Sequence, residues 1–176
     1  TALPFAASAA TPATSAGGKY VFAYFTGDNT SEQKIRFAVS DDGYNFTAIN
    51  GNQPVAEQTT GTGCARDPYL FRGQDGYFYM VATDMDASLG WWDVNDAMTV
   101  WRSADLVNWS DESHISIKDV KNADGTPALP ANETVHCFWA PQVIWDASTG
   151  KYMVYFSLST SSFTGSGYFF RQSFGA

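Results

Sequence analysis

The chain has few charges, few cysteines and no long apolar run. Only 16% of its 176 residues are charged, and ten basic against 18 acidic residues give a net charge of −8. The basic residues are scattered singly, so the sequence offers no basic patch for nucleic acid or an anionic lipid surface. No apolar stretch approaches the roughly 20 residues that a membrane-spanning helix needs. The composition therefore favours a compact protein with a neutral or cationic partner.

Helical patterns are lacking as well. No capped stretch places apolar residues at the i, i+3, i+4 and i+7 spacing over three turns. Aromatic residues are abundant instead, with 13 Phe, 9 Tyr and 6 Trp. Rings in this number suit β-structure and contact with carbohydrate. The sequence predicts an all-β fold.

The start of the chain indicates a mature, secreted protein. Residues 1–17 are rich in Ala, Ser, Thr, Pro and Gly, and we expect them to form an N-terminal tail. They lack the basic region of an intact signal peptide. Four Asn-x-Ser/Thr sequons stand at Asn29, Asn45, Asn108 and Asn132. Cys64 and Cys137 are the only cysteines, and an even count in an oxidising compartment predicts a disulfide between them. We expect an extracellular glycoprotein.

A repeated pattern organises the rest of the chain. Three stretches combine a turn glycine with an aromatic-rich strand: "GKYVFAYFTG" (18–27), "DGYFYMVATD" (75–84) and "GKYMVYFSLS" (150–159). Strands that end in Asp/Gly turns precede the second and third copies, as "RDPYLFRGQDG" and "WAPQVIWDASTG". A strand, a Ser-x-Asp turn and a short aromatic strand follow the first and second copies, as "KIRFAVSDDGYNFTAI" and "AMTVWRSADLVNW". The unit has four antiparallel strands and recurs about every 55 to 75 residues, as in β-propeller blades.

The predicted blades span about 18–60, 61–130 and 131–176, with the third incomplete. A propeller needs at least four blades to close, so we expect the others on a second chain or a further segment. Residues 86–98 and 111–130 are expected to be long loops, where binding residues concentrate.

Asp67 is the leading candidate for chemistry. The repeat places it at the start of an inner strand facing the central channel, with Trp139 at the matching point one blade later. Pro68 biases Asp67 toward an extended conformation. Arg66 either lowers the pKa of this carboxylate or, because adjacent strand residues face opposite ways, braces a neighbouring blade. The plainer interpretation is that Asp67 is a turn residue.

The ordered motifs "ARDPYLFR", "DGYFYMVATD", "VWRSADLVNW" and "WAPQVIWDASTGKYMVYFS" resemble glycoside hydrolase family 43. The resemblance runs from about Gly18 to the end. It implies a five-bladed propeller, of which this chain supplies about two and a half blades, that cleaves arabinose- or xylose-containing polysaccharides with inversion. By motif match Asp67 is the general base, and the acid and a second aspartate lie on blades beyond residue 176. No cofactor is implied, although some members hold calcium in the channel.

Other residues are weaker candidates for sugar contact. Trp139 either stacks on a sugar ring or packs in the blade core, and Trp91 and Trp92 form an aromatic platform or plug their loop onto the body. Arg66 and Asp84 are the polar candidates, with structural capping as the alternative for Asp84. His136 suggests no metal, because no cluster with ligand spacing accompanies it.

Two other function classes stay open. A retaining fructan hydrolase of families 32 and 68 would use the "RDP" aspartate as a transition-state stabiliser, but the chain shows no Asn-Asp-Pro nucleophile motif before Asp67 and "WAP" fits family 43 better. A non-catalytic carbohydrate-binding propeller would keep the aromatics and lack the acid. A purely structural or interaction propeller is weakened by the polar and aromatic residues predicted at the channel.

Overall fold

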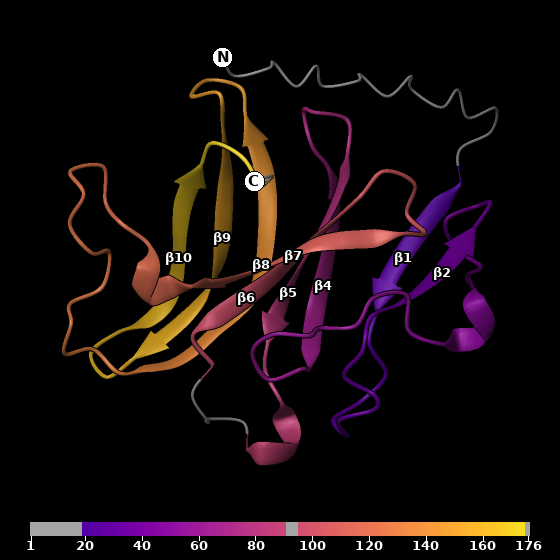
Figure 1. Cartoon of the computed structure of the whole chain (residues 1–176), viewed down its shortest axis with the longest axis horizontal. Helices are drawn as coiled ribbons and strands as arrows, with labels where there is room; N and C mark the ends of the chain where they lie inside the picture. Colours follow the sequence, from indigo (N-terminus) through magenta and orange to yellow (C-terminus); the bar gives the residue numbers. More distant parts are fainter. Residues whose placement is uncertain (1–18, 91–94, 175–176) are drawn as a thin grey trace, which may run out of the picture.

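The computed structural model describes residues 19–90 and 95–174, and these form three antiparallel sheets (Figure 1). The first sheet contains β1 (Tyr20–Tyr24), β2 (Arg36–Ser40) and β3 (Thr47–Ala48) in that order. The middle sheet contains β4 (Ala65–Arg72), β5 (Phe78–Asp84), β6 (Ala97–Ser103) and β7 (Trp109–Ser116). The third sheet contains β8 (Val135–Asp146), β9 (Lys151–Thr160) and β10 (Thr164–Arg171). Short 3₁₀ helices lie at η1 (Asn50–Asn52), η2 (Ala87–Leu89) and η3 (Ile117–Asp119).

The prediction of an all-β fold with antiparallel sheets is confirmed. The three sheets follow one another across Figure 1 in chain order, from indigo to yellow, in a propeller-like arrangement. The repeated aromatic segments are the strands β1, β5 and β9, as expected. The middle sheet has the predicted four strands, and the first and third have three each within the described residues.

The Ser-x-Asp turns repeat down to their hydrogen bonds. After β2, Ser40 Oγ and Asp42 Oδ1 accept backbone N–H groups of the turn, at 2.8 Å from Gly43 and Asn45 respectively. After β6, Ser103 and Asp105 play the same two roles at the equivalent places. A short polar side chain that satisfies turn amides fixes the chain reversal without a glycine at every position. The first and middle sheets therefore share one strand–turn–strand unit.

Two apolar clusters join the sheets. One lies between the middle and third sheets and includes Tyr79, Val81, Phe138 and Val154. The other lies between the first and middle sheets and includes Ile35, Phe37, Met80 and Trp101. Successive residues of β5 serve the two clusters in turn, because side chains of a strand alternate between its faces. The middle sheet is thus buried on both sides.

One expected loop is partly a strand. The polar stretch 111–130 begins inside β7, which runs from Trp109 to Ser116 and pairs with β6. The short aromatic strand predicted at the end of "AMTVWRSADLVNW" is thus longer than expected, and its continuation through Ser116 was missed because it is nearly all polar and lies at the outer edge of the sheet. The remainder from Val120 to Pro130 is a loop closed by an isolated bridge between Lys121 and Pro127.

Candidate active site

Asp67 lies at an irregularity in the inner strand β4. The pairing of β4 with β5 shifts between Arg66 and Tyr69, so that Asp67 and Pro68 together lie opposite a single residue of β5. Asp67 has φ 50°, in the left-handed region, so the expectation of an extended conformation is wrong. Bulges of this kind re-aim side chains, and a proline fits one because it has no N–H to contribute to the ladder.

The same irregularity recurs in the third sheet. The pairing of β8 with β9 shifts between Trp139 and Gln142, and Ala140 there has φ 51° ahead of Pro141. Asp67 therefore corresponds to Ala140, and Trp139 corresponds to Arg66. The predicted match of Asp67 with Trp139 is therefore wrong by one residue. Trp139 is partly buried in β8, and its contact with a sugar stays a prediction.

A buried hydroxyl joins the two irregularities. Thr83 of β5, which is fully buried, donates a hydrogen bond from Oγ1 to Asp67 Oδ2 at 3.0 Å. The same Oγ1 accepts the backbone N–H of Ala140 at 2.8 Å. The Asp67 carboxylate is thus anchored on one oxygen and reaches the third sheet through a single side chain. The sequence reasoning missed Thr83, because a threonine in a strand is ordinary.

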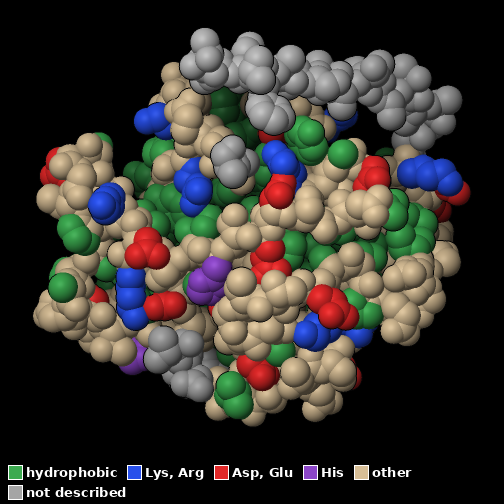
Figure 2. Space-filling view, in the orientation of Figure 1, with side chains coloured by type: hydrophobic (Ala, Val, Ile, Leu, Met, Phe, Trp, Pro, Cys, Tyr) green, Lys and Arg blue, Asp and Glu red, His purple; other side chains and the backbone are tan. Residues whose placement is uncertain are grey.

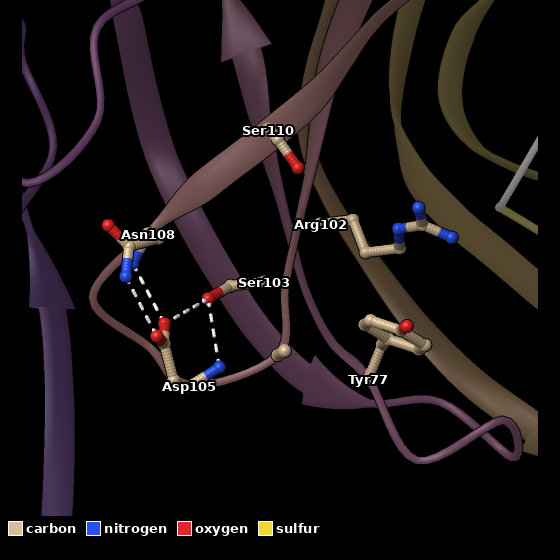
Figure 3. Close-up of a pocket in the computed structure, with 7 residues that line it drawn as sticks. Tyr77, Arg102, Ser103, Asp105, Asn108 and Ser110 are labelled. Atoms are coloured by element: carbon tan, nitrogen blue, oxygen red, sulfur yellow. Dashed lines mark hydrogen bonds between the residues drawn. The ribbon is translucent and has the colours of Figure 1, made fainter. Parts of the chain in front are cut away.

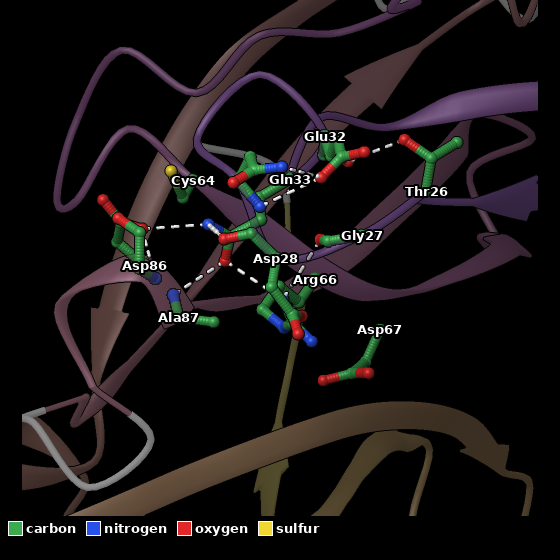
Figure 4. A network of polar contacts seen from close by, with 12 residues as sticks. Thr26, Gly27, Asp28, Glu32, Gln33, Cys64, Arg66, Asp67, Asp86 and Ala87 are labelled. Carbon is green, nitrogen blue, oxygen red and sulfur yellow. Dashed lines mark hydrogen bonds and ion pairs between the residues drawn. The ribbon is translucent and has the colours of Figure 1, made fainter.

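Arg66 points away from Asp67 and toward the segment that connects β1 and β2. Its guanidinium is buried, donates to Asp28 Oδ1 at 2.8 Å and to Gln33 Oε1 at 3.1 Å, and lies 4.5 Å from the centre of the Phe25 ring. In Figure 4 the Asp67 carboxylate lies outside this network. The geometry matches the alternative that Arg66 braces a neighbouring sheet.

The brace extends to the segment after β5. Gln33, fully buried, donates to Asp86 Oδ1 at 2.9 Å and accepts the N–H of Ala87 at 2.8 Å. Burial disfavours the charged form of Asp86, but hydrogen bonds from Ser88 and Gln33 outweigh it and hold the pKa of Asp86 below its usual value. The connection between β1 and β2, Arg66 and the start of the loop after β5 therefore share one polar network (Figure 4).

Asp84 is a structural anchor. It is 5% exposed, and its Oδ1 accepts from Gln58 Nε2 and Thr62 Oγ1, both at 2.6 Å. Its Oδ2 lies 2.6 Å from His114 Nε2 of β7. Gly61 passes so close that a Cβ there would lie 2.1 Å from Oδ2. These contacts match the capping role that was the alternative for Asp84.

The predicted Cys64–Cys137 disulfide is wrong, because both cysteines are free. They hold equivalent places ahead of successive irregularities, and each is buried in its own surroundings. Cys64 Sγ lies 4.0 Å from the Thr30 carbonyl oxygen, toward the first sheet, whereas Cys137 pairs with Ser159 in the third. Burial raises the pKa of both thiols.

The remaining predicted residues are exposed, partly buried or outside the described residues. Trp91 and Trp92 fall in 91–94, outside the described residues. All four sequon asparagines, Asn29, Asn45, Asn108 and Asn132, are exposed, and their glycosylation stays a prediction. His136 is partly buried. Within 19–90 and 95–174, no three His, Cys, Asp or Glu side chains are grouped to hold a metal ion, and no helix is long and apolar enough to cross a membrane.

One surface hollow lies at the second Ser-x-Asp turn. It measures about 210 Å³ and is lined by Tyr77, Arg102, Ser103, Ala104, Asp105, Asn108 and Ser110 (Figure 3). Arg102 lies 4.6 Å from the centre of the Tyr77 ring and also pairs with Asp111. The hydrogen bonds within the turn take up the Asp105 carboxylate. Asp67 is not among the lining residues, so this hollow is separate from the candidate active site.

Comparisons with known proteins point to sugar-cleaving enzymes. An α-L-arabinofuranosidase of Bifidobacterium longum subsp. longum is 28% identical over 147 residues, which are 78% of this chain and 13% of that protein. A family 117 glycoside hydrolase of Zobellia galactanivorans has a TM-score of 0.59 at 15% identity, over 89% of this chain and 49% of its own. A family 32 β-fructofuranosidase of Bombyx mori, solved with sucrose, has a TM-score of 0.55 at 21% identity, over 86% of this chain and 31% of its own.

At these identities the two structures show a shared fold alone, and the chain spans less than half of each relative's length. A family described as a probable glycosyl hydrolase domain, related to glycosyl hydrolase family 43, matches residues 16–167. That match covers Asp67, Thr83 and both strand irregularities. The chain belongs to this glycosyl hydrolase family 43-related family.

Proposed function

We propose that this chain supplies the general base of an inverting glycosidase, and that Asp67 is that base. One observation carries the proposal: Asp67 is partly exposed at a strand irregularity and held on one oxygen by Thr83. Among residues 19–90 and 95–174, no donor reaches its second oxygen, Oδ1. A carboxylate with one anchored and one available oxygen can accept a proton from a water molecule.

Inversion needs a partner acid on the other side of the glycosidic bond. The two carboxyl groups of inverting enzymes lie roughly 6.5–9.5 Å apart, which leaves room for the attacking water. We place the acid and the third carboxylate on blades outside these 176 residues, in a five-bladed propeller. The internal contacts of Asp84 and Asp86 favour this, because both carboxylates already serve structural hydrogen bonds.

The substrate we propose is an arabinose- or xylose-containing polysaccharide or oligosaccharide of plant cell walls. The arabinofuranosidase relative supports the sugar class, and the abundance of aromatic residues in the sequence suits carbohydrate contact. We propose an extracellular location on the four exposed sequons. No cofactor is needed for this chemistry, and calcium in the channel would act only structurally.

A retaining fructan hydrolase is the second candidate. The likeness to the β-fructofuranosidase of Bombyx mori favours it at the level of fold. Asp67 would then stabilise the transition state, and the product would keep its anomeric configuration. A non-catalytic sugar-binding propeller is the third candidate, in which Asp67 would only contact the sugar.

The test is Asp67→Asn in the polypeptide that carries the whole catalytic domain. Because amide nitrogen and oxygen cannot take the proton from water, we expect kcat on arabinofuranosyl and xylosyl substrates to fall by at least about 10³-fold, while substrate binding persists. The anomer first released, followed by proton NMR, should be inverted.

Turnover by Asp67→Asn close to that of the unaltered enzyme would remove Asp67 from the reaction. A retained anomer would favour the fructan-type alternative. Binding of oligosaccharide by the unaltered protein without any release of reducing sugar would favour the non-catalytic one. Asp75→Asn, at an exposed turn carboxylate, controls for the loss of a charge.

A further inference from the structure

We infer that Thr83 is the positioning residue for Asp67 and makes the orientation of this carboxylate depend on the backbone of the neighbouring sheet. The inference rests on the proposed function of Asp67. Three groups form one line: the Ala140 N–H, the Thr83 hydroxyl and the Asp67 Oδ2 atom, joined at 2.8 and 3.0 Å. They come from β8, β5 and β4, so one contact between sheets and one between strands meet at the Thr83 Oγ1 atom.

The direction of these hydrogen bonds is fixed by chemistry. A backbone N–H can only donate, so Thr83 Oγ1 must accept from Ala140. The hydroxyl has one proton left to give, and it gives that proton to Asp67. Oδ2 must therefore act as an acceptor, which an ionised carboxylate does with both oxygens. The proton taken from water consequently goes to Oδ1, and the line of hydrogen bonds decides which oxygen is the base.

The anchor is rigid. Thr83 is fully buried in β5, whose neighbours β4 and β6 hydrogen-bond to it on both sides. Ala140 is held at φ 51°, which a non-glycine residue adopts only when the surroundings impose it, and the following Pro141 is buried. A threonine in a strand also has a restricted χ1. The hydroxyl is thus fixed relative to both sheets before any sugar arrives.

The decisive experiment removes the hydroxyl and keeps the shape. Thr83→Val should lower kcat about 10- to 100-fold, because a hydrogen bond to a charged group and the position of a reacting group are each worth about that much. KM should stay within about 2-fold, since Thr83 is fully buried and its hydroxyl already bonds Asp67 and Ala140. Thr83→Ser restores the hydroxyl and should return kcat to within about 3-fold of the unaltered enzyme.

Thr99→Val is the matched control. Thr99 is another fully buried threonine of the middle sheet, on β6, and its hydroxyl has no hydrogen-bond partner in the described parts of the chain. Removing this hydroxyl should leave kcat and KM unchanged and keep or raise the melting temperature. If Thr83→Val does not fold, Thr83→Ala removes the same hydroxyl without adding volume.

The outcomes separate the inference from the proposed function. Near-normal kcat in folded Thr83→Val or Thr83→Ala, with Asp67→Asn inactive, would overturn the inference and leave the base in place. Activity in Asp67→Asn would overturn the proposed function first. A loss of kcat in Thr83→Ser as large as in Thr83→Val would also overturn the inference, because the hydroxyl would then be irrelevant. Equal losses in Thr99→Val would show a general effect of core polarity instead.

Discussion

Asp67 and Ala140 occupy the same place in two successive inner strands, and only Asp67 carries an acid. Each precedes a proline, each has a left-handed φ, and each stands at a shift in strand register. The Thr83 hydroxyl connects one to the other. The catalytic role that we propose for Asp67 thus rests on a repeated backbone feature combined with one carboxylate and one hydroxyl.

Much of this pairing was visible in the sequence, and part of it was not. Asp67-Pro68 and Ala140-Pro141 share a spacing of 73 residues, since 140 − 67 = 73 and 141 − 68 = 73. Aligning the two prolines gives the correspondence of Asp67 with Ala140, whereas aligning Asp67 with the bulky Trp139 is wrong by one residue. The left-handed φ could not be predicted, because a residue before proline is normally extended. It arises from the strand irregularity.

Arg66 gives the stability prediction at this scale. Arg66→Ala should lower the free energy of unfolding by about 2–4 kcal/mol, because a buried guanidinium with several partners contributes charged hydrogen bonds and packing together. It leaves the buried Gln33 carbonyl without this donor, while Asp28 can turn to water because it is mostly exposed. Urea unfolding measures the difference. Arg72→Ala, at an exposed arginine of the same strand, should cost under about 1 kcal/mol. Equal costs would show that the Arg66 network adds nothing special.

At the scale of the element, the strands followed from two signals: a turn glycine and a run of aromatic residues. β1, β5 and β9 satisfy both and lie where expected. β7 satisfies neither, because its position at the sheet edge allows polar residues on both faces. The disulfide prediction was wrong for a reason at the same scale. Cysteines at equivalent places in successive strands lie in separate surroundings, and an even count gives no geometry.

Glu133 gives the pH prediction at this scale, because it holds the turn between β9 and β10. Hydrogen bonds from the hydroxyls of Thr160 and Ser162 lower the pKa of Glu133 from 4.5 to about 2. A carboxyl whose pKa is lower in the folded state stabilises the fold above the unfolded value, and the stabilisation is lost as pH falls. Glu133→Gln should therefore be less stable than the unaltered chain above pH 4.5. The gap should close between pH 4.5 and about 2.

Urea unfolding at a series of pH values measures this gap. Glu57→Gln is the control, because Glu57 is exposed and accepts no hydrogen bond within the described residues. A gap between Glu133→Gln and the unaltered chain that stays constant down to pH 2 would contradict the assignment.

At the scale of the molecule, the outer sheets leave apolar faces uncovered. On the third sheet Ile144, Tyr155, Tyr168 and Phe170 are exposed, and Tyr155 and Tyr168 are direct neighbours in the register. On the first sheet the rings of Phe22 and Tyr24 stack at 5.5 Å, and Phe22 is 52% exposed. Figure 2 shows hydrophobic side chains at the right of the view, in the region of β1 and β2, among few and separate basic groups. Faces of this kind normally meet another layer.

The prediction at this scale concerns the 176 residues expressed alone. They should self-associate, because both outer faces would be open to water and to one another. Replacing Tyr168 and Phe170 by lysine should shift the population toward monomer in light scattering after size exclusion. Leu89→Lys, at an exposed leucine on η2 outside the two outer sheets, should not. A monodisperse monomer before any substitution would contradict the prediction.

The hydroxyl of Thr83 also sets an order of events during synthesis. A chain made from its N-terminus releases Asp67 and Thr83 before Ala140. Until β8 packs against the middle sheet, the Thr83 hydroxyl lacks its donor and is free to turn. If Asp67 is the general base, as we propose, its carboxylate acquires the anchored orientation only when the next sheet arrives, so a partly made propeller carries the base before it is oriented.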